Sequence, residues 1–277
     1  MYKRQPILLD TEKVDDADYM IMESVYGDRN HESRNARKER LQAIIQDNYK
    51  RKGTLIIPTF SLERSQELLF EINDLVENER IPEMSVYFDS PLAIRLTKIY
   101  KDYEKLLNKS ALDHINHGDD IFMFRGLKST LRTEESKLIL RAPDPKIIIA
   151  GSGMSNGGRI IHHEKNYLPD PNNTLLLIGY QSAGTMGRAI EDGAKFVHLF
   201  GEQVPVRAHI EKISGYSGHK DSDHLIDFVG DTQETVKQVY VVMGEPKSSL
   251  FLVQKLRDTF GIDARAPKVG ARVVLSC

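Results

Sequence analysis

The chain has 277 residues, which is enough for one large domain or two smaller ones with a sizeable core. Lysine and arginine number 38 against 40 aspartate and glutamate, so the net charge of −2 gives no sign of a polyanion partner. The single cysteine, Cys277, excludes an internal disulfide and a cluster of metal-bound thiolates. The first residues lack the apolar core of a signal peptide, and no apolar run approaches the length of a membrane span. We therefore expect a soluble, cytoplasmic protein.

Apolar strands alternate with helical patterns over the first two thirds of the chain. The clearest helix spans 61–79, with Leu68, Leu69, Ile72 and Leu75 at helical spacing and Ser61 as its N-cap. The other predicted helices span 31–50 and 92–107, and the predicted strands span 19–22, 54–57, 86–88, 121–124, 147–150 and 174–180. Unbroken apolar strands between amphipathic helices are typical of a parallel sheet covered on both faces, so the sequence predicts an α/β fold.

The pattern changes after about residue 193. The alternating residues of 195–199 and 204–213, on either side of a Gly-Glu-Gln turn, predict a hairpin. A helix at 221–229, a strand at 237–242, a helix at 247–260 and a strand at 272–275 follow. The sequence contains no repeat and no obvious linker, so any two domains must be closely docked or one inserted in the other.

Two polar residues near the ends of the chain are candidates for catalysis. Glu23 closes a short apolar strand, the place where α/β active sites collect their carboxylates, although it could also be a loop carboxylate that pairs with Arg29. His219 lies among small residues in a loop, where an imidazole is available for proton transfer, and Asp221 can cap the helix that follows. The spacing from His219 to His224 places the two rings on different sides of a helix, so we do not expect them to share a metal.

Two glycine-rich loops follow strands in the middle of the chain. Glycine amides between a strand and a helix can cradle phosphate, and an arginine beside them can add bidentate contacts. The simpler alternatives are that each loop is a tight turn that requires glycine, and that the arginines pair with carboxylates such as Glu164 or Glu191 and only hold the loops in place. The predicted phosphate-binding residues are Ser152, Gly153, Ser155, Gly157, Gly158 and Arg159 in the first loop, and Gln181, Gly184, Thr185, Gly187 and Arg188 in the second.

A competing pattern occurs in the first of these loops. Residues 153–157 fit G-x-S-x-G after a strand, which would make Ser155 a nucleophile with Asp221 and His219 as its partners. The order of those residues along the chain departs from the usual one unless His224 serves as the base. So short a pattern also arises by chance in glycine-rich sequence, so we favour the phosphate-binding interpretation.

Six segments in order resemble the β-CASP group of metallo-β-lactamase-fold nucleases. They are ESVYG at 23–27, DSPLA at 89–93, the two glycine-rich loops, SGHKD at 217–221 and VVMGE at 241–245. The resemblance covers about residues 5–270 and implies the C-terminal part of a metallo-β-lactamase αββα fold with an inserted β-CASP domain. It divides the chain into 1–45, 46–200 and 201–277, with the β-CASP domain in the middle.

The resemblance implies that Glu23 and His219 act as a catalytic pair. The carboxylate would orient the imidazole, which would protonate the oxygen that leaves when a phosphodiester is cleaved. Family enzymes hold two zinc ions mainly through an H-x-H-x-D-H motif, which does not occur in these 277 residues. Met243 stands where many members have a further histidine ligand, and a thioether is a soft ligand that hydrolytic zinc does not favour. We therefore expect no metal ligand in this chain and interpret Met243 as a core residue.

Two functions of different classes follow from these expectations. The chain is either part of a zinc-dependent nuclease that acts on RNA, or a non-catalytic module that binds nucleic acid or regulates. We expect it to be a fragment of a longer enzyme or a truncated gene product, inactive without the metal-binding half. The expected partner is nucleic acid, in particular single-stranded RNA, with no membrane; DNA as the substrate and a homodimer stay open alternatives.

Overall fold

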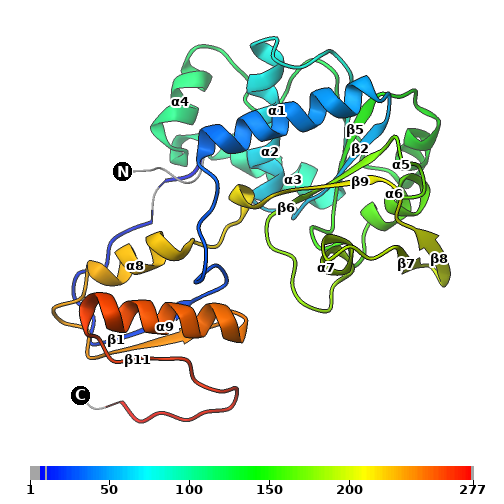
Figure 1. Cartoon of the computed structure of the whole chain (residues 1–277). Helices are drawn as coiled ribbons and strands as arrows, with labels where there is room; N and C mark the ends of the chain where they lie inside the picture. The colour runs from blue at the N-terminus through cyan, green and yellow to red at the C-terminus, as the bar shows by residue number, and fades with distance from the viewer. Residues whose placement is uncertain (1–6, 10, 276–277) are drawn as a thin grey trace. The chain divides into compact units, whose positions relative to one another are not determined.

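The computed structural model describes residues 7–9 and 11–275. These residues form two compact units, which we call the large unit (7–9 and 32–218) and the small unit (11–31 and 219–275) (Figure 1). The predicted division into 1–45, 46–200 and 201–277 refers to the domains of the family, whereas these units are defined by compactness. The predicted domain boundaries therefore stay a prediction. Nowhere in the described residues does a helix combine the length and the apolar character that crossing a bilayer requires.

The large unit is built on a parallel sheet of six strands in the order β4-β3-β5-β2-β6-β9. Neighbouring strands end together, because Ala150 is the register partner of both Pro58 and Asp89. The loops that leave β2, β3 and β5 therefore emerge side by side at the carboxyl edge of the sheet. The strands are β2 (Thr54–Pro58), β3 (Ser85–Asp89), β4 (Leu127–Ser129), β5 (Lys146–Ala150), β6 (Thr174–Ile178) and β9 (His209–Ile213).

Both faces of this sheet are covered, as the unbroken apolar strands predicted. Along β2, Leu55 and Ile57 belong to a core cluster with residues of α1 and α2, whereas Ile56 belongs to a second cluster with residues of α6, α7 and the β7–β8 hairpin. Figure 1 shows these helices and the hairpin around the sheet. The bounds in the large unit are α1 (Arg34–Lys50), α2 (Arg64–Glu77), α3 (Pro91–Asp102), η1 (Glu104–Leu106), α4 (Lys109–Asn116), α5 (Thr133–Leu138), η2 (Ile139–Arg141), α6 (Ile160–Tyr167), α7 (Met186–Glu191), β7 (Phe196–Leu199), β8 (Glu202–Pro205) and η3 (Ser214–Tyr216).

The small unit is a second parallel sheet, in the order β1-β10-β11, packed against two helices. Its strands are β1 (Tyr19–Glu23), β10 (Gln238–Val242) and β11 (Ala264–Arg265), and its helices are α8 (Ser222–Gly230) and α9 (Pro246–Phe260). Asp221 caps α8 by accepting a hydrogen bond from the His224 amide, as predicted. The α/β fold class with parallel sheets flanked by helices is thus confirmed.

Several predicted elements are wrong in detail. Ser61 does not cap α2, which begins at Arg64 after Glu63 in the N-cap position. Residues 121–124 and 272–275 form no strand: the first are irregular chain from which Ile121, Phe122 and Phe124 reach the core, and the second are exposed. The predicted second hairpin strand at 204–213 splits in two, because the chain leaves β8 and enters the six-stranded sheet as β9 beside β6.

Candidate active site and nucleic-acid interface

Glu23 and His219 form an ion pair in the small unit. The Nδ1 atom of His219 lies 2.8 Å from Oε2 of Glu23. Glu23 is the last residue of β1, so the strand places its carboxylate at the carboxyl edge of the small sheet, while His219 comes from the loop before α8. Arg29, the alternative partner for Glu23, lies instead beside Asp28, at 3.5 Å.

Backbone amides hold the Glu23 carboxylate in place. The amide of Lys220 donates to Oε1 at 3.0 Å, and that of Val25 donates to Oε2 at 3.3 Å. Partial burial acts to raise the pKa of the Glu23 carboxyl, but the hydrogen bond and charge of His219 together with these amides outweigh it and lower the pKa. Glu23 is therefore ionised at neutral pH, which suits a carboxylate that orients an imidazole. The backbone of His219 is fixed as well, because its carbonyl lies 3.1 Å from Nε2 of His31.

Met243 follows β10 at the same edge of the small sheet. Val242, the residue before it, is the register partner of Glu23. The interpretation of Met243 as a core residue is wrong, because 74% of it is exposed and its backbone has a φ of +65°. The turn is tight: a Cβ on Gly244 would collide with Ser24, so glycine is required there.

The donor atoms in the described residues do not fit a zinc site. No group of three or more histidine, cysteine, aspartate or glutamate side chains is arranged there to hold a metal ion. Met243 offers only a thioether, and His224 forms an ion pair with Asp221. The described residues therefore lack a complete set of zinc ligands.

The two glycine-rich loops meet in the large unit. We call residues 151–159, after β5, the first loop, and residues 179–188, after β6, the second loop. The amide of Gly187 donates to the carbonyl of Met154 at 3.1 Å, and the Gln181 side chain donates to the carbonyl of Gly153 at 3.1 Å. A Cβ on Gly187 would collide with the Gln181 side chain, so this glycine allows the loops to approach. Gly187 and Gln181 thus join the two loops.

Ser155 points into the protein rather than toward a ligand. It is buried, and its hydroxyl donates to the buried carboxyl of Glu164. Burial raises the pKa of Glu164 to about 8, although the Ser155 hydrogen bond acts in the opposite direction. Because its hydroxyl bonds to an acid instead of an imidazole, the geometry gives no support to Ser155 as a nucleophile.

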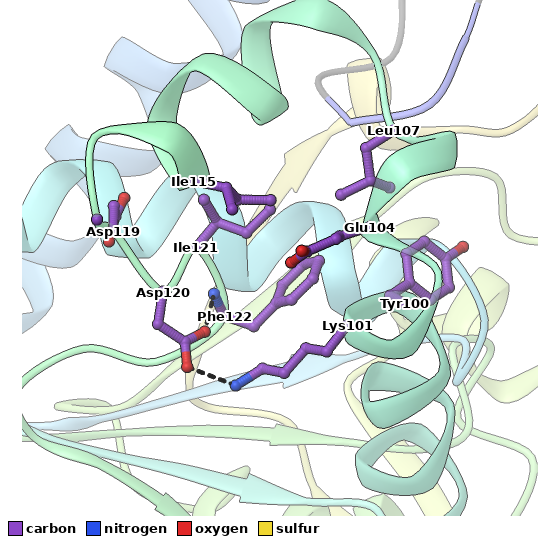
Figure 2. A pocket seen from close by; sticks show the side chains of 10 residues that line it. Tyr100, Lys101, Glu104, Leu107, Ile115, Asp119, Asp120, Ile121 and Phe122 are labelled. Atoms are coloured by element: carbon purple, nitrogen blue, oxygen red, sulfur yellow. Dashed lines mark hydrogen bonds and ion pairs between the residues drawn. The ribbon is translucent and has the colours of Figure 1, made fainter.

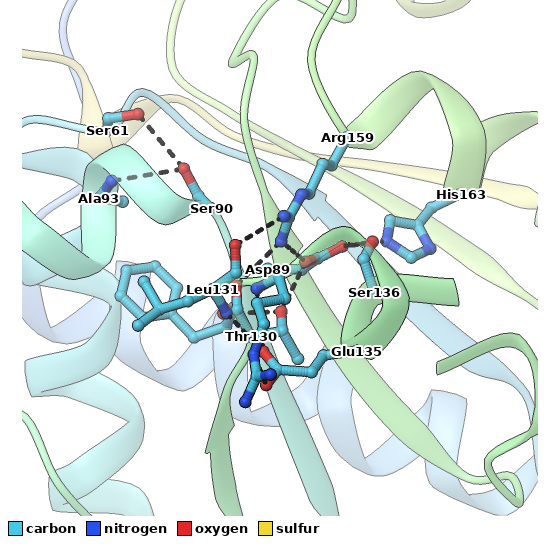
Figure 3. Close-up of polar contacts among 12 residues, drawn as sticks. Ser61, Asp89, Ser90, Ala93, Thr130, Leu131, Glu135, Ser136, Arg159 and His163 are labelled. Atoms are coloured by element: carbon cyan, nitrogen blue, oxygen red, sulfur yellow. Dashed lines mark hydrogen bonds and ion pairs between the residues drawn. The ribbon is translucent and has the colours of Figure 1, made fainter. Parts of the chain in front are cut away.

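Arg159 is bound within the large unit by Asp89. Its guanidinium lies 2.6 Å from Oδ1 of Asp89 and donates to the carbonyls of Thr130 and Leu131 at 2.9 and 2.8 Å (Figure 3). Asp89 ends β3 and Arg159 ends the first loop, so the pair ties that loop to the edge of the sheet. A carboxylate was the predicted alternative to phosphate for this arginine, but Glu164 was the wrong choice.

Asp89 is the centre of a polar network that was not predicted from the sequence. The carboxylate also receives hydrogen bonds from Thr130 and Ser136, at 2.5 and 2.6 Å, and lies 2.7 Å from Nε2 of His163 (Figure 3). Burial acts to raise the pKa of Asp89, but these partners and Arg159 lower it to about 2. The available signals were its place at the end of a buried strand and at the start of the DSPLA segment.

Arg188 is the more accessible arginine of the two loops. Its Nε lies 3.0 Å from both carboxylate oxygens of Asp192, on the surface, whereas its other predicted partner, Glu191, pairs with Lys212. Thr185 caps α7 by accepting from the Arg188 amide at 3.2 Å. Arg188 is therefore placed at the surface end of the second loop, where exchange of Asp192 for a phosphate requires no buried group to move.

The remaining predicted residues shape the backbone of the loops. Gly158 and Gly184 have φ of +72° and +84°, which favour glycine. Gly158 also lies so close to Gly151 that a Cβ would clash, whereas a Cβ on Gly157 would meet open space. The amide of Ser152 donates to the carbonyl of Gly157 at 3.2 Å, which closes the first loop on itself.

A pocket of about 260 Å³ lies elsewhere in the large unit, between α3, η1, α4 and the turns at 118–122. Lys101 and Asp120 form an ion pair of 2.6 Å across it, and the ring of Phe122 lies beside them (Figure 2). None of the predicted site residues lines this pocket.

Comparison with known proteins relates both units to one group of enzymes. The family model described as Beta-Casp domain matches residues 65–190, and that described as Zn-dependent metallo-hydrolase RNA specificity domain matches residues 203–267. Ribonuclease TTHA0252 of Thermus thermophilus is 36% identical over 236 residues, which are 85% of this chain and 53% of that protein.

Two further relatives have similar matches. Transcription termination factor FttA of Pyrococcus abyssi is 30% identical over 256 residues, covering 90% of this chain and 39% of that protein. An RNase J-like protein of Methanocaldococcus jannaschii is 30% identical over 259 residues, covering 93% of this chain and 59% of that protein. The chain thus spans about half the length of the curated relatives that it matches.

Proposed function

Because the chain belongs to the β-CASP family of metallo-β-lactamase-fold nucleases, we propose that it supplies the proton-donating pair and part of the RNA-binding surface of an RNA-cleaving enzyme. The observation that carries this proposal is the ion pair between Glu23 and His219. The names of the relatives, a ribonuclease and an RNase J-like protein, support RNA as the substrate.

The geometry of the pair assigns a role to each residue. Because Nδ1 of His219 faces the Glu23 carboxylate, the N–H on Nδ1 donates to that carboxylate. The opposite nitrogen, Nε2, is then the atom that gives its proton to the leaving oxygen of a phosphodiester, after which the imidazole is neutral. Glu23 is a positioning residue: it fixes the orientation of the ring, and the amides of Lys220 and Val25 hold its carboxylate in that position.

The nucleophilic water requires a metal that the described residues do not hold by themselves. Zinc is the metal named in the description of the matching family, and when bound it would lower the pKa of a water molecule and so supply hydroxide. In this proposal the zinc ligands come from outside the described residues.

The two arginines have different roles in RNA binding. Arg188 contacts phosphate, because its present partner Asp192 is exposed and easily replaced. Arg159 holds the first loop through the buried Asp89. The test is a filter-binding titration with single-stranded RNA at several salt concentrations. Arg188→Ala should reduce the slope of log affinity against log salt by the equivalent of about one phosphate contact. Arg159→Ala should instead lower the melting temperature; a full phosphate's change of slope in Arg159→Ala without loss of stability would reverse these roles.

Cleavage is tested with this chain fused to a metal-binding half from a family enzyme. Glu23→Gln and His219→Ala should each lower single-turnover cleavage by about 10²–10⁴-fold while RNA affinity stays unchanged, and the double variant should lose little more than either alone. His224→Ala is the matched control, because His224 is similarly exposed nearby but pairs with Asp221. Near-normal turnover of His219→Ala would remove the proton-donor role.

A second candidate function is a non-catalytic module that binds nucleic acid. It is favoured by the thioether of Met243 where the family resemblance implies a metal-binding histidine, and by the lack of a metal-binding cluster in the described residues. The fusion also distinguishes this candidate: RNA binding by the chain without cleavage in any zinc-loaded fusion would support the module and contradict the enzyme.

A further inference from the structure

We propose that the exposed ring of Phe60 is a stacking platform for one nucleobase of single-stranded RNA, beside the first loop. This inference rests on the proposed function, since it concerns the RNA that the nuclease would hold. It goes beyond that function in naming a subsite for a base, whereas the glycine-rich loops concern the backbone of the RNA.

Phe60 lies at the carboxyl edge of the large sheet. It follows β2 by two residues, and the amide of Thr59 before it donates to the carbonyl of Ala150, 2.9 Å away, at the end of β5. The carbonyl of Phe60 accepts hydrogen bonds from the amide and hydroxyl of Ser65, at 3.3 and 2.8 Å. The backbone of Phe60 is thus fixed at the edge where ligands of parallel α/β sheets bind.

The ring of Phe60 lies directly against Gly153 of the first loop. A Cβ on Gly153 would come within 2.7 and 2.9 Å of two ring carbons, closer than such atoms approach. Gly153 therefore has a role besides offering an amide, because it lets the ring lie on the loop. Phe60 remains 43% exposed, so the contact with the loop leaves much of the residue accessible to solvent.

The surroundings of Phe60 combine apolar and hydroxyl groups. Leu62, in the loop after β2, and Leu92, in the first turn of α3, are also exposed. The hydroxyls of Ser61 and Ser90 lie 3.4 Å apart at the same edge (Figure 3). A Cβ built on Gly151 would be 3.4 Å from Ser90 Oγ and 3.8 Å from Ser61 Oγ, so both hydroxyls flank the first loop. Apolar surface with a few convergent polar groups is typical of ligand sites.

A nucleobase fits this site better than a protein partner does. A single ring beside a loop matches one base, whereas stable protein interfaces bury about 800 Å² on each side. Stacking on an aromatic ring tolerates any base, which agrees with phosphate contacts that read no sequence. The exposed Phe200 at the tip of the β7–β8 hairpin differs, because the ring of His162 already lies 4.6 Å from its ring centre. Phe200 is therefore a matched control.

The chain contains no tryptophan, so Phe60→Trp introduces a single fluorescent reporter. We expect an oligouridine to quench this tryptophan, and an abasic ribose-phosphate oligomer of equal length to leave it unchanged. Phe200→Trp should respond to neither. In filter binding, Phe60→Leu should weaken oligouridine affinity roughly 5-fold to 150-fold and Phe60→Tyr should retain it, since stacking contributes about 1–3 kcal/mol per base. The salt slope of Phe60→Leu should stay that of the wild type, because no phosphate contact is removed.

The possible outcomes separate this inference from the proposed function. A wild-type chain that binds neither oligomer contradicts the proposed function and the stacking site with it. If the wild type binds RNA but Phe60→Leu binds equally well and only melts earlier, the ring is a packing residue and the inference fails alone. Equal losses for oligouridine and the abasic oligomer would likewise overturn it, as would an unquenched Phe60→Trp that binds RNA.

Discussion

Replacement of Asp89 by asparagine tests whether a buried charge holds the first loop. Asp89 is fully buried, and its carboxylate receives hydrogen bonds from Arg159, Thr130 and Ser136 beside His163. The lowering of its pKa from 3.8 to about 2 favours the ionised form by about 2 kcal/mol, at about 1.4 kcal/mol per pKa unit. Asp89→Asn also leaves Arg159 without its charged partner, and breaking a buried ion pair costs about 3–5 kcal/mol. We expect the large unit to lose that much stability at pH 7.

The dependence on pH follows from the direction of the shift. Because the pKa of Asp89 is lower in the folded protein than in the unfolded chain, its ionised form stabilises the fold fully above pH 3.8. That stabilisation is lost as the pH falls through about 2. The difference in stability between wild type and Asp89→Asn should therefore be constant at neutral pH and shrink by about 2 kcal/mol as the wild-type carboxylate becomes protonated.

Hydrogen exchange of β3 and β5, measured by mass spectrometry at several urea concentrations, reports the stability of this part of the large unit. Asp192→Asn is the matched control, because it also removes a carboxylate paired with an arginine, Arg188, but at the surface. Its effect should stay below about 1 kcal/mol. A loss in Asp89→Asn no larger than in Asp192→Asn, or a difference from wild type that does not change below pH 4, would refute the reasoning.

Three further changes give distinct outcomes. Gly153→Ala should cost about 1–3 kcal/mol, because its Cβ meets the ring of Phe60, whereas Gly157→Ala should change thermal stability by less than about 0.5 kcal/mol; similar melting curves for the two variants would contradict the contact. Glu164 has a pKa raised from 4.5 to about 8, so the folded protein retains a proton that the unfolded chain releases. The stability of the wild type should fall as the pH rises from 4.5 to about 8, and Glu164→Gln should remove that fall. The same dependence of melting temperature on pH in the wild type and in Glu164→Gln would count against the buried acid. The chain alone should retain less than one zinc per molecule after dialysis against a mild chelator, since Met243 offers only a thioether, and stoichiometric retention by metal analysis would show this to be wrong.

Local patterns in the sequence were sufficient to predict secondary structure where the burial of successive residues follows a regular pattern. Strands β2 and β5 were predicted nearly to the residue, because unbroken apolar runs bounded by polar turns have few other interpretations. The strand predicted at 121–124 is wrong for a physical reason: Ile121, Phe122 and Phe124 are buried, but they reach the core from irregular chain. Burial alone does not distinguish a strand from an apolar loop.

Pairings between distant segments could not be obtained from local patterns. The prediction that Glu23 pairs with His219 came from resemblance to a family, since neither neighbourhood specifies the other, and the structure brings the two side chains together. Arg159 and Arg188 show the opposite limit. Their glycine-rich surroundings predicted that both arginines bind phosphate. Arg159, however, pairs inside the protein with Asp89, which is distant in the sequence.

The role of His219 as proton donor is tested most directly by changing the leaving group. The fusion to a metal-binding half is assayed in single turnover on RNA with either oxygen or sulfur at the scissile leaving position. A thiolate leaves without protonation, so a general acid assists only the oxygen substrate. We expect His219→Ala to slow cleavage of the oxygen substrate by about 10²–10⁴-fold and to leave the sulfur substrate within a few-fold of wild type. Equal losses on both substrates would contradict proton donation by His219.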